Sequence, residues 1–118
     1  MQKVVNFYSN GLGLEELGRF KDHDGYSGVM LGQPGESWHL EFTEKAGGSF
    51  CPAPTRDNLL VFYFQDKQQR DLVAQRIFEH GYPEVEPENP YWRSNGITIE
   101  DPDGWRIVLM GVKSVNGE

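Results

Sequence analysis

The residues best suited to chemistry in this sequence are His39 and Glu41, an imidazole and a carboxylate two positions apart. They lie in the segment Trp38 to Phe42, where polar and apolar side chains alternate with the period of a strand. Side chains two positions apart in a strand point to the same face, roughly 6.5 to 7 Å apart at their base. Such a pair can offer a ligand a hydrogen bond or a charge, but it falls short of the three or four donors that hold a divalent metal. The alternative is structural, with Glu41 a core carboxylate that Arg106 neutralises and His39 a partner of either.

The stretch from Gly96 to Met110 is the best-defined structural element around these residues. Two segments, Gly96 to Glu100 and Trp105 to Met110, alternate as strands do. The four residues between them, Asp101-Pro102-Asp103-Gly104, are all favoured in turns. We therefore expect a β-hairpin over this stretch.

A weaker copy of this pattern lies upstream. The turn-like residues Gln33-Pro34-Gly35-Glu36 precede Trp38 as the aspartate turn precedes Trp105. Before each copy lies a helix-like segment that a glycine ends, Gly11 in the first case and Gly81 in the second. Agreement of helix stop, turn and strand in the same order predicts two copies of one structural unit.

The remaining elements follow from hydrophobic periodicity and from capping residues. Asp66 is placed to cap a helix that His80-Gly81 ends. The nearly continuous apolar run from Asn58 to Phe64 is typical of a strand that is buried on both faces. In the first half we expect a helix over 2–10 and strands over 14–20, 26–31 and 37–44, with a polar turn at 21–25. The second half adds a short strand over 82–85 and a polar loop over 86–95.

The second half therefore reads strand, helix, strand, strand, strand, whereas the first half lacks the opening strand. We expect a single domain with a first unit over 1–44, a linker over 45–57, a second unit over 58–112 and a tail over 113–118. A complete first unit would need about 10 to 20 further residues before Met1, or a neighbouring chain or rearranged edge to cover the gap.

Charge and composition exclude several classes of partner. The chain has 18 acidic and 11 basic residues, a net charge of −7 that repels nucleic-acid phosphates and anionic lipids and favours a cationic small molecule. No apolar run approaches the ~20 residues of a membrane span, and no signal peptide is visible. The single Cys51 cannot form an internal disulfide. We expect a cytoplasmic protein with neither nucleic-acid nor membrane partners.

The repeated βαβββ pattern, the DPDG turn, the Leu40-Glu41-Phe42 strand and the apolar strand that Asn58 opens together resemble the vicinal-oxygen-chelate superfamily. That superfamily includes glyoxalase I, extradiol dioxygenases and bleomycin-resistance proteins. The likeness extends from Gln2 to Met110, and the part from Asn89 onward looks like a small uncharacterised bacterial branch of the glyoxalase/bleomycin-resistance group. The resemblance implies an α+β fold of two βαβββ units whose curved mixed sheets form a cup, usually in a homodimer.

The resemblance also implies where metal ligands would lie, because metal-dependent relatives place them on the first and last strands of each unit. These positions correspond here to Glu41, Asn58 and Val108, and the strand that would carry the fourth is missing. Asn58 is a weak neutral donor and Val108 offers none. We therefore expect no cofactor and no tightly held metal, with Glu41 the one weak candidate ligand; a divalent metal would need further ligands from the missing strand or a partner chain.

The resemblance implies a cup that is mostly apolar with a few polar groups. Counting by two from the three ligand positions adds His39 and Thr43, then Leu60, Phe62 and Phe64, then Arg106 and Met110. Tyr91 and Trp92 lie in a loop that could close the cup. The expected ligand-binding residues are His39, Glu41, Asn58, Phe62, Phe64, Tyr91, Trp92 and Arg106, and no catalytic residue is assigned.

Two main functions fit this set of residues, and the small number of candidate metal-coordinating residues favours the first. It is a small-molecule-binding protein that sequesters a cationic or aromatic molecule between apolar walls, as bleomycin-resistance proteins do. The alternative is a metal-dependent lyase, isomerase or dioxygenase that uses Glu41 and His39 with donors from the missing strand or a partner chain. A dimeric scaffold with a vestigial pocket is a third. An unpaired edge in the first unit also favours a homodimer.

Overall fold

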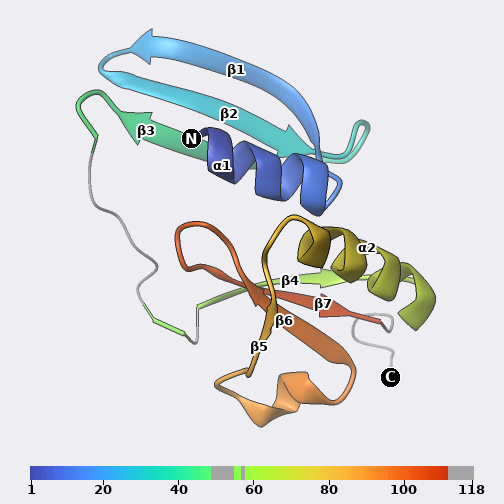
Figure 1. The fold of residues 1–118 in the computed structure, drawn as a ribbon. Coiled ribbons are helices and arrows are strands. Elements are labelled where there is room, and N and C mark those ends of the chain that lie inside the picture. Colours follow the sequence, from blue (N-terminus) through green and yellow to red (C-terminus); the bar gives the residue numbers. More distant parts are fainter. Residues whose placement is uncertain (49–54, 57, 112–118) are drawn as a thin grey trace. The chain divides into compact units, whose positions relative to one another are not determined.

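The structure, a computed structural model, describes residues 1–48, 55–56 and 58–111 (Figure 1). The chain folds as two compact units, Met1–Cys51 and Pro52–Glu118. The expected tail over 113–118 lies outside the described residues, as do residues 49–54 and 57 of the expected linker.

The second unit has the expected order of a strand, a helix and three further strands. Within the described residues its sheet has four strands in the order β4-β7-β6-β5. Strand β4 runs parallel to β7, and the other neighbours are antiparallel. The elements are β4 (Leu59–Tyr63), α2 (Lys67–Glu79), β5 (Glu84–Val85), the 3-10 helix η2 (Pro90–Arg93), β6 (Gly96–Glu100) and β7 (Arg106–Met110).

The expected hairpin is confirmed, and Asp101 holds its turn together. One oxygen of the Asp101 side chain, Oδ1, accepts hydrogen bonds from the backbone N–H groups of Asp103 and Trp105, both at 2.9 Å. Gly104 has a φ of +89°, which glycine adopts without steric cost. The side chain and the glycine together let β6 turn directly into β7.

Helix α2 begins and ends where the sequence predicts. The Asp66 side chain accepts a hydrogen bond from the Gln69 backbone N–H at 2.9 Å, which satisfies one of the free donors of the first turn. At the other end His80 is the C-terminal cap, and its Nδ1 lies 2.8 Å from the carbonyl oxygen of Arg76. His80 therefore ends the helix as the sequence predicts, and its ring also contacts the last turn.

The register of the second sheet separates two faces. Arg106, Val108 and Met110 point to one face of β7, whereas Ile107 and Leu109 point to the other. Helix α2 lies on the side of Ile107 and Leu109, because a Cβ on the next residue with that orientation, Gly111, would lie 3.0 Å from Lys67 Cα. The β4 residues that pair with Arg106, Val108 and Met110 are Leu59, Val61 and Tyr63.

Strand β4 is less buried than its apolar sequence predicts. Leu59, Leu60, Val61 and Phe62 are half-buried and Tyr63 is exposed, so the expectation of a strand buried on both faces is wrong. The reason is its position, because β4 forms the edge of the sheet and has a neighbouring strand on one side, β7, within the described residues.

The first unit contains a helical segment followed by an antiparallel sheet. The helix expected over 2–10 is present as α1 (Gln2–Val5) and the π-helix η1 (Asn6–Gly11). Within the described residues the sheet has three strands in the order β1-β2-β3. They are β1 (Glu15–His23), β2 (Tyr26–Gly32) and β3 (His39–Lys45). No helix in the described part of the chain has the length and apolarity needed to cross a membrane.

The turn between β1 and β2 is tighter than expected. The strands continue until His23 pairs with Tyr26, so the turn consists of Asp24 and Gly25 rather than all of residues 21–25. Both turn residues have positive φ, +52° and +85°, as a type I′ hairpin turn requires. The Asp24-Gly25 pair is the sequence signal for this turn, and the polar residues 21–23 before it belong to β1.

The helical segment packs against one face of the first sheet. The rings of Tyr8 and Phe42 lie 4.7 Å apart between centroids, which places the helix on the Phe42 side of β3. Phe7 and Tyr8 from the helix and Val29 and Leu31 from β2 are among the most buried side chains. The opposite face of the sheet carries the alternate residues of each strand.

The two units differ at one strand position. In the second unit β4 precedes the helix and lies beside the last strand, β7. Within the described residues of the first unit, no strand lies in the corresponding place beside β3. The expectation that the first unit lacks its opening strand therefore agrees with the described topology.

Candidate functional site

His39 and Glu41 share one face of the first sheet, as the two-residue period predicts. The His39 Nε2 and Glu41 Oε1 atoms lie 3.7 Å apart, and the side chains are 46% and 45% exposed. Their neighbours Leu40 and Phe42 are half-buried on the helix side. The pair is therefore accessible, and the expected core role for Glu41 does not fit its exposure.

Apolar side chains and two glycines surround this pair on the same face. Met30 pairs with Glu41 across the β2–β3 ladder, and Gly32 pairs with His39. A Cβ on Gly32 would lie 3.1 Å from Leu17 Cδ1, and a Cβ on Gly28 would lie 2.5 Å from the Phe20 ring. The glycines thus let Leu17 and Phe20 lie close over the sheet. We call the surface formed by Leu17, Phe20, Met30, His39 and Glu41 the first-unit face.

Sequence reasoning missed the apolar part of the first-unit face. Leu17 is exposed and Phe20 and Met30 are half-buried. A register shift between Glu16 and Gly18 disturbs the alternation of β1, so the direction of Leu17 could not be counted from the sequence. The available signal was Gly28 and Gly32, two positions of β2 that lack side chains.

Arg106 is buried, and all three nitrogens of its guanidinium group make polar contacts. Its side chain is 4% exposed, and Nε and Nη2 lie 3.0 and 2.9 Å from Glu100 Oε2. Its third nitrogen, Nη1, donates to the backbone carbonyl of Glu86 at 2.6 Å. The expectation that Arg106 neutralises a carboxylate is right in kind, but the carboxylate observed is Glu100, its cross-strand neighbour. Arg106 is therefore part of the framework of the second unit.

Three expected site residues do not lie on the Arg106 face of the second sheet. Phe62 pairs with Leu109, so its side chain points to the α2 side, and Phe64 follows the end of β4. Asn58 precedes the strand and accepts a hydrogen bond from Thr55 Oγ1 at 2.7 Å. The expectation that they share a face with Arg106 is wrong. An apolar run without alternation does not reveal which residues face which way.

Tyr91 and Trp92 lie on η2 in an ordered turn. The Asn89 side chain accepts a hydrogen bond from the Tyr91 N–H at 2.9 Å, which fixes the start of the turn. The Tyr91 and Trp92 rings meet edge to face, with their centroids 4.9 Å apart. Tyr91 is 69% exposed, whereas Trp92 is half-buried. The loop thus presents one aromatic ring to solvent.

Thr98 is a buried polar residue that sequence reasoning did not single out. It is 1% exposed and lies on the Arg106 face of β6, between Val85 and Val108. Its hydroxyl has no hydrogen-bond partner among the described residues. A threonine in an alternating strand is ordinarily placed facing solvent, so nothing in the sequence marked it.

The described residues do not fit a metal centre. Nowhere among them do three His, Cys, Asp or Glu side chains gather as a metal ion requires. On the Arg106 face of the second sheet, the position expected for a metal ligand is Val108, and neither it nor its neighbour Val61 offers a donor atom. On the first-unit face His39 and Glu41 supply two donors.

Solved structures with the same arrangement of elements define the class of fold. Glyoxalase I of Leishmania major matches with a TM-score of 0.73 and 20% identity, covering 94% of this chain and 78% of that one. TnmS3, an antibiotic-binding protein from Streptomyces sp. CB03234, matches with a TM-score of 0.63 and 22% identity, covering 92% and 84%. The chain therefore has the vicinal-oxygen-chelate fold that its residues resemble.

Within that fold the chain belongs to the YycE-like family. The YycE-like N-terminal domain matches residues 1–43 and the YycE-like C-terminal domain matches residues 57–111. The uncharacterized protein YycE of Bacillus subtilis (strain 168) is 48% identical over 118 residues, which are all of this chain and 85% of the relative. The crystal structure of a Bacillus subtilis YycE protein matches with a TM-score of 0.91, covering 99% of this chain and 85% of that one.

Proposed function

We propose that this chain is a small-molecule-binding protein and that its first-unit face binds an aromatic, positively charged ligand. The observation that carries the proposal is the composition of that face, where accessible apolar side chains adjoin the exposed His39–Glu41 pair. Apolar walls with a few polar groups are the usual make-up of a small-molecule site.

Magnitudes indicate what each part of the face contributes. Covering about 200 Å² of apolar surface is worth about 5 kcal/mol at ~25 cal/mol per Å². An exposed ion pair contributes up to about 1 kcal/mol, which is up to about a factor of five in affinity. The apolar side chains would therefore supply most of the affinity, and Glu41 would select for positive charge. The net charge of −7 acts in the same direction.

The test compares a cationic and an anionic aromatic dye, thioflavin T and anilinonaphthalene sulfonate. Glu41→Gln should weaken thioflavin T binding roughly two- to five-fold and should not weaken binding of the anionic dye. Glu36→Gln, which removes the same charge from the turn before β3, is the matched control and should leave both affinities unchanged. Equal effects of the two substitutions, or no saturable binding of thioflavin T, would contradict the proposal.

In the second unit the proposal keeps Tyr91 and Trp92 as ligand contacts, on a surface of that unit by itself. The exposed Tyr91 ring offers a flat surface on which an aromatic cation can stack. TnmS3, which has the same fold, is named as an antibiotic-binding protein, and this agrees with a binding role for such a scaffold. Tyr91→Ala should weaken thioflavin T binding, whereas Tyr63→Ala, at another exposed tyrosine of the second unit, should not.

A metal-dependent lyase, isomerase or dioxygenase is the second candidate. The 3.7 Å approach of His39 Nε2 to Glu41 Oε1 favours it, because two donors on one strand face can begin a metal site. Metal analysis of protein purified without chelators distinguishes the candidates. Stoichiometric metal that Glu41→Ala removes, together with turnover lost in the same variant, would favour the enzyme. Metal-free protein that binds thioflavin T would favour the binding protein.

The proposal includes a homodimer in the cytoplasm with no nucleic-acid or membrane partner. The support for the dimer is the free edge of β3 within the described residues, because unpaired edges recruit other strands. The support for the partners is the acidic net charge of the chain.

A further inference from the structure

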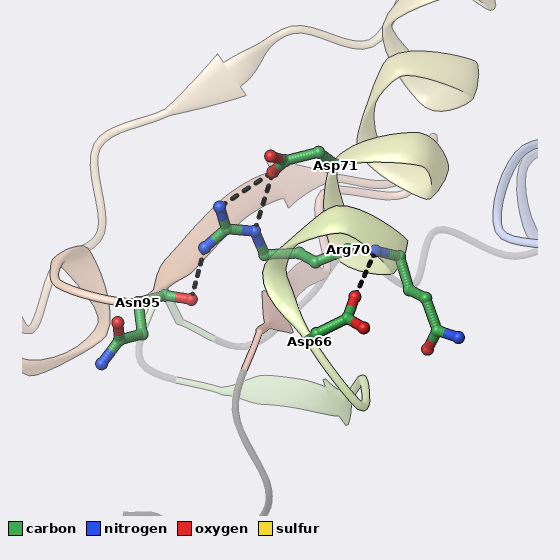
Figure 2. A network of polar contacts seen from close by, with 5 residues as sticks. Asp66, Arg70, Asp71 and Asn95 are labelled. Atoms are coloured by element: carbon green, nitrogen blue, oxygen red, sulfur yellow. Dashed lines mark hydrogen bonds and ion pairs between the residues drawn. The ribbon is translucent and has the colours of Figure 1, made fainter.

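The loop that carries Tyr91 and Trp92 is held by an arginine at each end. We call residues 86–95, which join β5 to β6, the aromatic loop. At its start Arg106 Nη1 donates to the carbonyl oxygen of Glu86 at 2.6 Å. At its end Arg70 Nη1 donates to the carbonyl oxygen of Asn95 at 2.8 Å, as Figure 2 shows. Both contacts fix backbone, so they position the loop whatever side chains it carries.

Each arginine is itself held by a carboxylate. Glu100 on β6 accepts from two nitrogens of Arg106, which leaves the third for Glu86. Asp71 on α2 accepts from Nε and Nη2 of Arg70 at 3.0 and 2.8 Å, which leaves Nη1 for Asn95 (Figure 2). The planar guanidinium presents its donors in a fixed fork, so a carboxylate on one side directs the remaining donor.

Further contacts reinforce both ends of the aromatic loop. The Arg93 side chain reaches back along the loop to the Glu86 carboxylate at 2.9 Å. The Asn95 carbonyl also accepts a hydrogen bond from the Gly111 N–H at 3.1 Å. A side chain at Gly111 would collide with Lys67 at the start of α2, so glycine lets the helix bring Arg70 close to Asn95.

Burying a guanidinium group is costly unless it is paired, and both arginines here are paired with a carboxylate. The Arg106 and Arg70 side chains are 4% and 13% exposed, yet each directs a donor to the backbone of the aromatic loop. Between those anchors Tyr91 is 69% exposed. A ring presented on a backbone fixed at both ends loses little conformational freedom when a ligand stacks on it.

We propose that Arg70 and Arg106 are positioning residues for ligand binding, which hold the aromatic loop so that Tyr91 is preformed for an aromatic cation. This inference rests on the proposed function, since it takes Tyr91 as a ligand contact. It assigns Arg106 a role through Tyr91 rather than in direct contact with the ligand.

The first measurement is hydrogen–deuterium exchange without any ligand. Arg106→Lys and Arg70→Lys keep the charge but lose the fork, and Arg19→Lys on β1 is the matched control. Amides of residues 88–93 should exchange roughly ten-fold faster in the first two variants, while amides of β6 and β7 stay protected. If Arg106→Lys does not fold, the test rests on Arg70→Lys. Unchanged loop exchange in a folded Arg70→Lys protein would overturn the inference.

The second measurement is a double-mutant cycle on thioflavin T affinity. Arg70→Lys and Arg106→Lys should each weaken binding roughly three- to ten-fold, and neither should weaken it further in a Tyr91→Ala background. Additive losses in that background would overturn the inference, as would unchanged affinity in the arginine variants. In those two cases a retained Glu41→Gln effect would leave the proposed function standing. Absence of saturable dye binding in the unsubstituted protein would overturn both.

Discussion

At the residue scale, two contacts between a carboxylate and a nitrogen-bearing side chain have different consequences because their exposure differs. Glu100 pairs with Arg106, whose side chain is buried, so removing Glu100 leaves a buried charge without its carboxylate. Glu41 pairs with His39 in a setting where both are half-exposed and water can replace either. The first pair therefore maintains structure, and the second is available to a ligand.

Thr98 gives a prediction about stability. Its buried hydroxyl has no partner among the described residues, and an unpaired buried hydroxyl costs roughly 1–3 kcal/mol. Thr98→Val keeps the shape and removes the hydroxyl, so it should raise the free energy of unfolding by about 1 kcal/mol in urea titrations. Thr43→Val, the same change at an exposed position of β3, is the control and should have little effect. A loss of stability in Thr98→Val would show that the hydroxyl has a partner.

The Glu16–Arg19 pair on β1 gives a prediction about pH. The hydrogen bond from the Arg19 side chain holds the pKa of the Glu16 carboxyl below its ordinary 4.5. A lowered pKa in the folded state means that the contribution to stability is present above pH 4.5 and disappears as the pH falls through the lowered value. An NMR titration of the Glu16 carboxyl should show the pKa rise toward 4.5 in Arg19→Gln. An unchanged midpoint would mean that the exposed pair is not formed in solution.

At the element scale, turns and caps determine where strands and helices meet. Asp101 accepts two backbone hydrogen bonds and closes the β6–β7 hairpin, on which Glu100 and Arg106 face each other. The position of the buried Arg106 therefore depends on a turn that lies outside any candidate site.

Substitution of Asp101 tests this dependence. Asp101→Ala removes the acceptor for both N–H groups and should lower the free energy of unfolding by roughly 1–2 kcal/mol. Asp101→Asn keeps a side-chain oxygen and should lose about half as much. Chemical denaturation of the two variants supplies the comparison. Equal losses in Ala and Asn would show that the side-chain hydrogen bonds do not hold the turn.

Elements with local signals were predictable from the sequence, whereas those set by pairing partners were not. The Asp101 turn and the caps of α2 rest on residues within a few positions of one another, so their chemistry is visible in the chain itself. The β4 register depends on which β7 residue lies beside Phe62, and an apolar run does not specify that. For the same reason the faces of His39 and Glu41 were predictable, because their strand alternates, and those of Asn58 and Phe62 were not.

At the scale of the whole molecule, the two units repeat one pattern but use it differently. The first unit exposes a mixed apolar and polar face, and the second unit buries its arginine and fixes an aromatic loop. The same fold serves proteins named as a glyoxalase and as an antibiotic-binding protein. The fold therefore does not decide between catalysis and binding. The choice between them depends on the residues that lie on the faces of the sheets.

Within the described residues β3 has a free edge, and this edge gives a prediction about assembly. We expect a homodimer, because an unpaired strand edge offers backbone donors and acceptors to another chain. Sedimentation or light scattering at micromolar concentration should give twice the mass of 13.5 kDa. A stable monomer under those conditions would count decisively against the dimer.

The most direct test of the central claim is to locate the bound dye on the protein. Backbone amide NMR during titration with thioflavin T should show saturable shifts at Leu17, Met30 and Glu41, and the Glu36 amide should not move. This result would place the aromatic cation on the first-unit face. Saturable shifts confined to other parts of the chain, or no saturable shift at all, would contradict the claim that this face is the binding site.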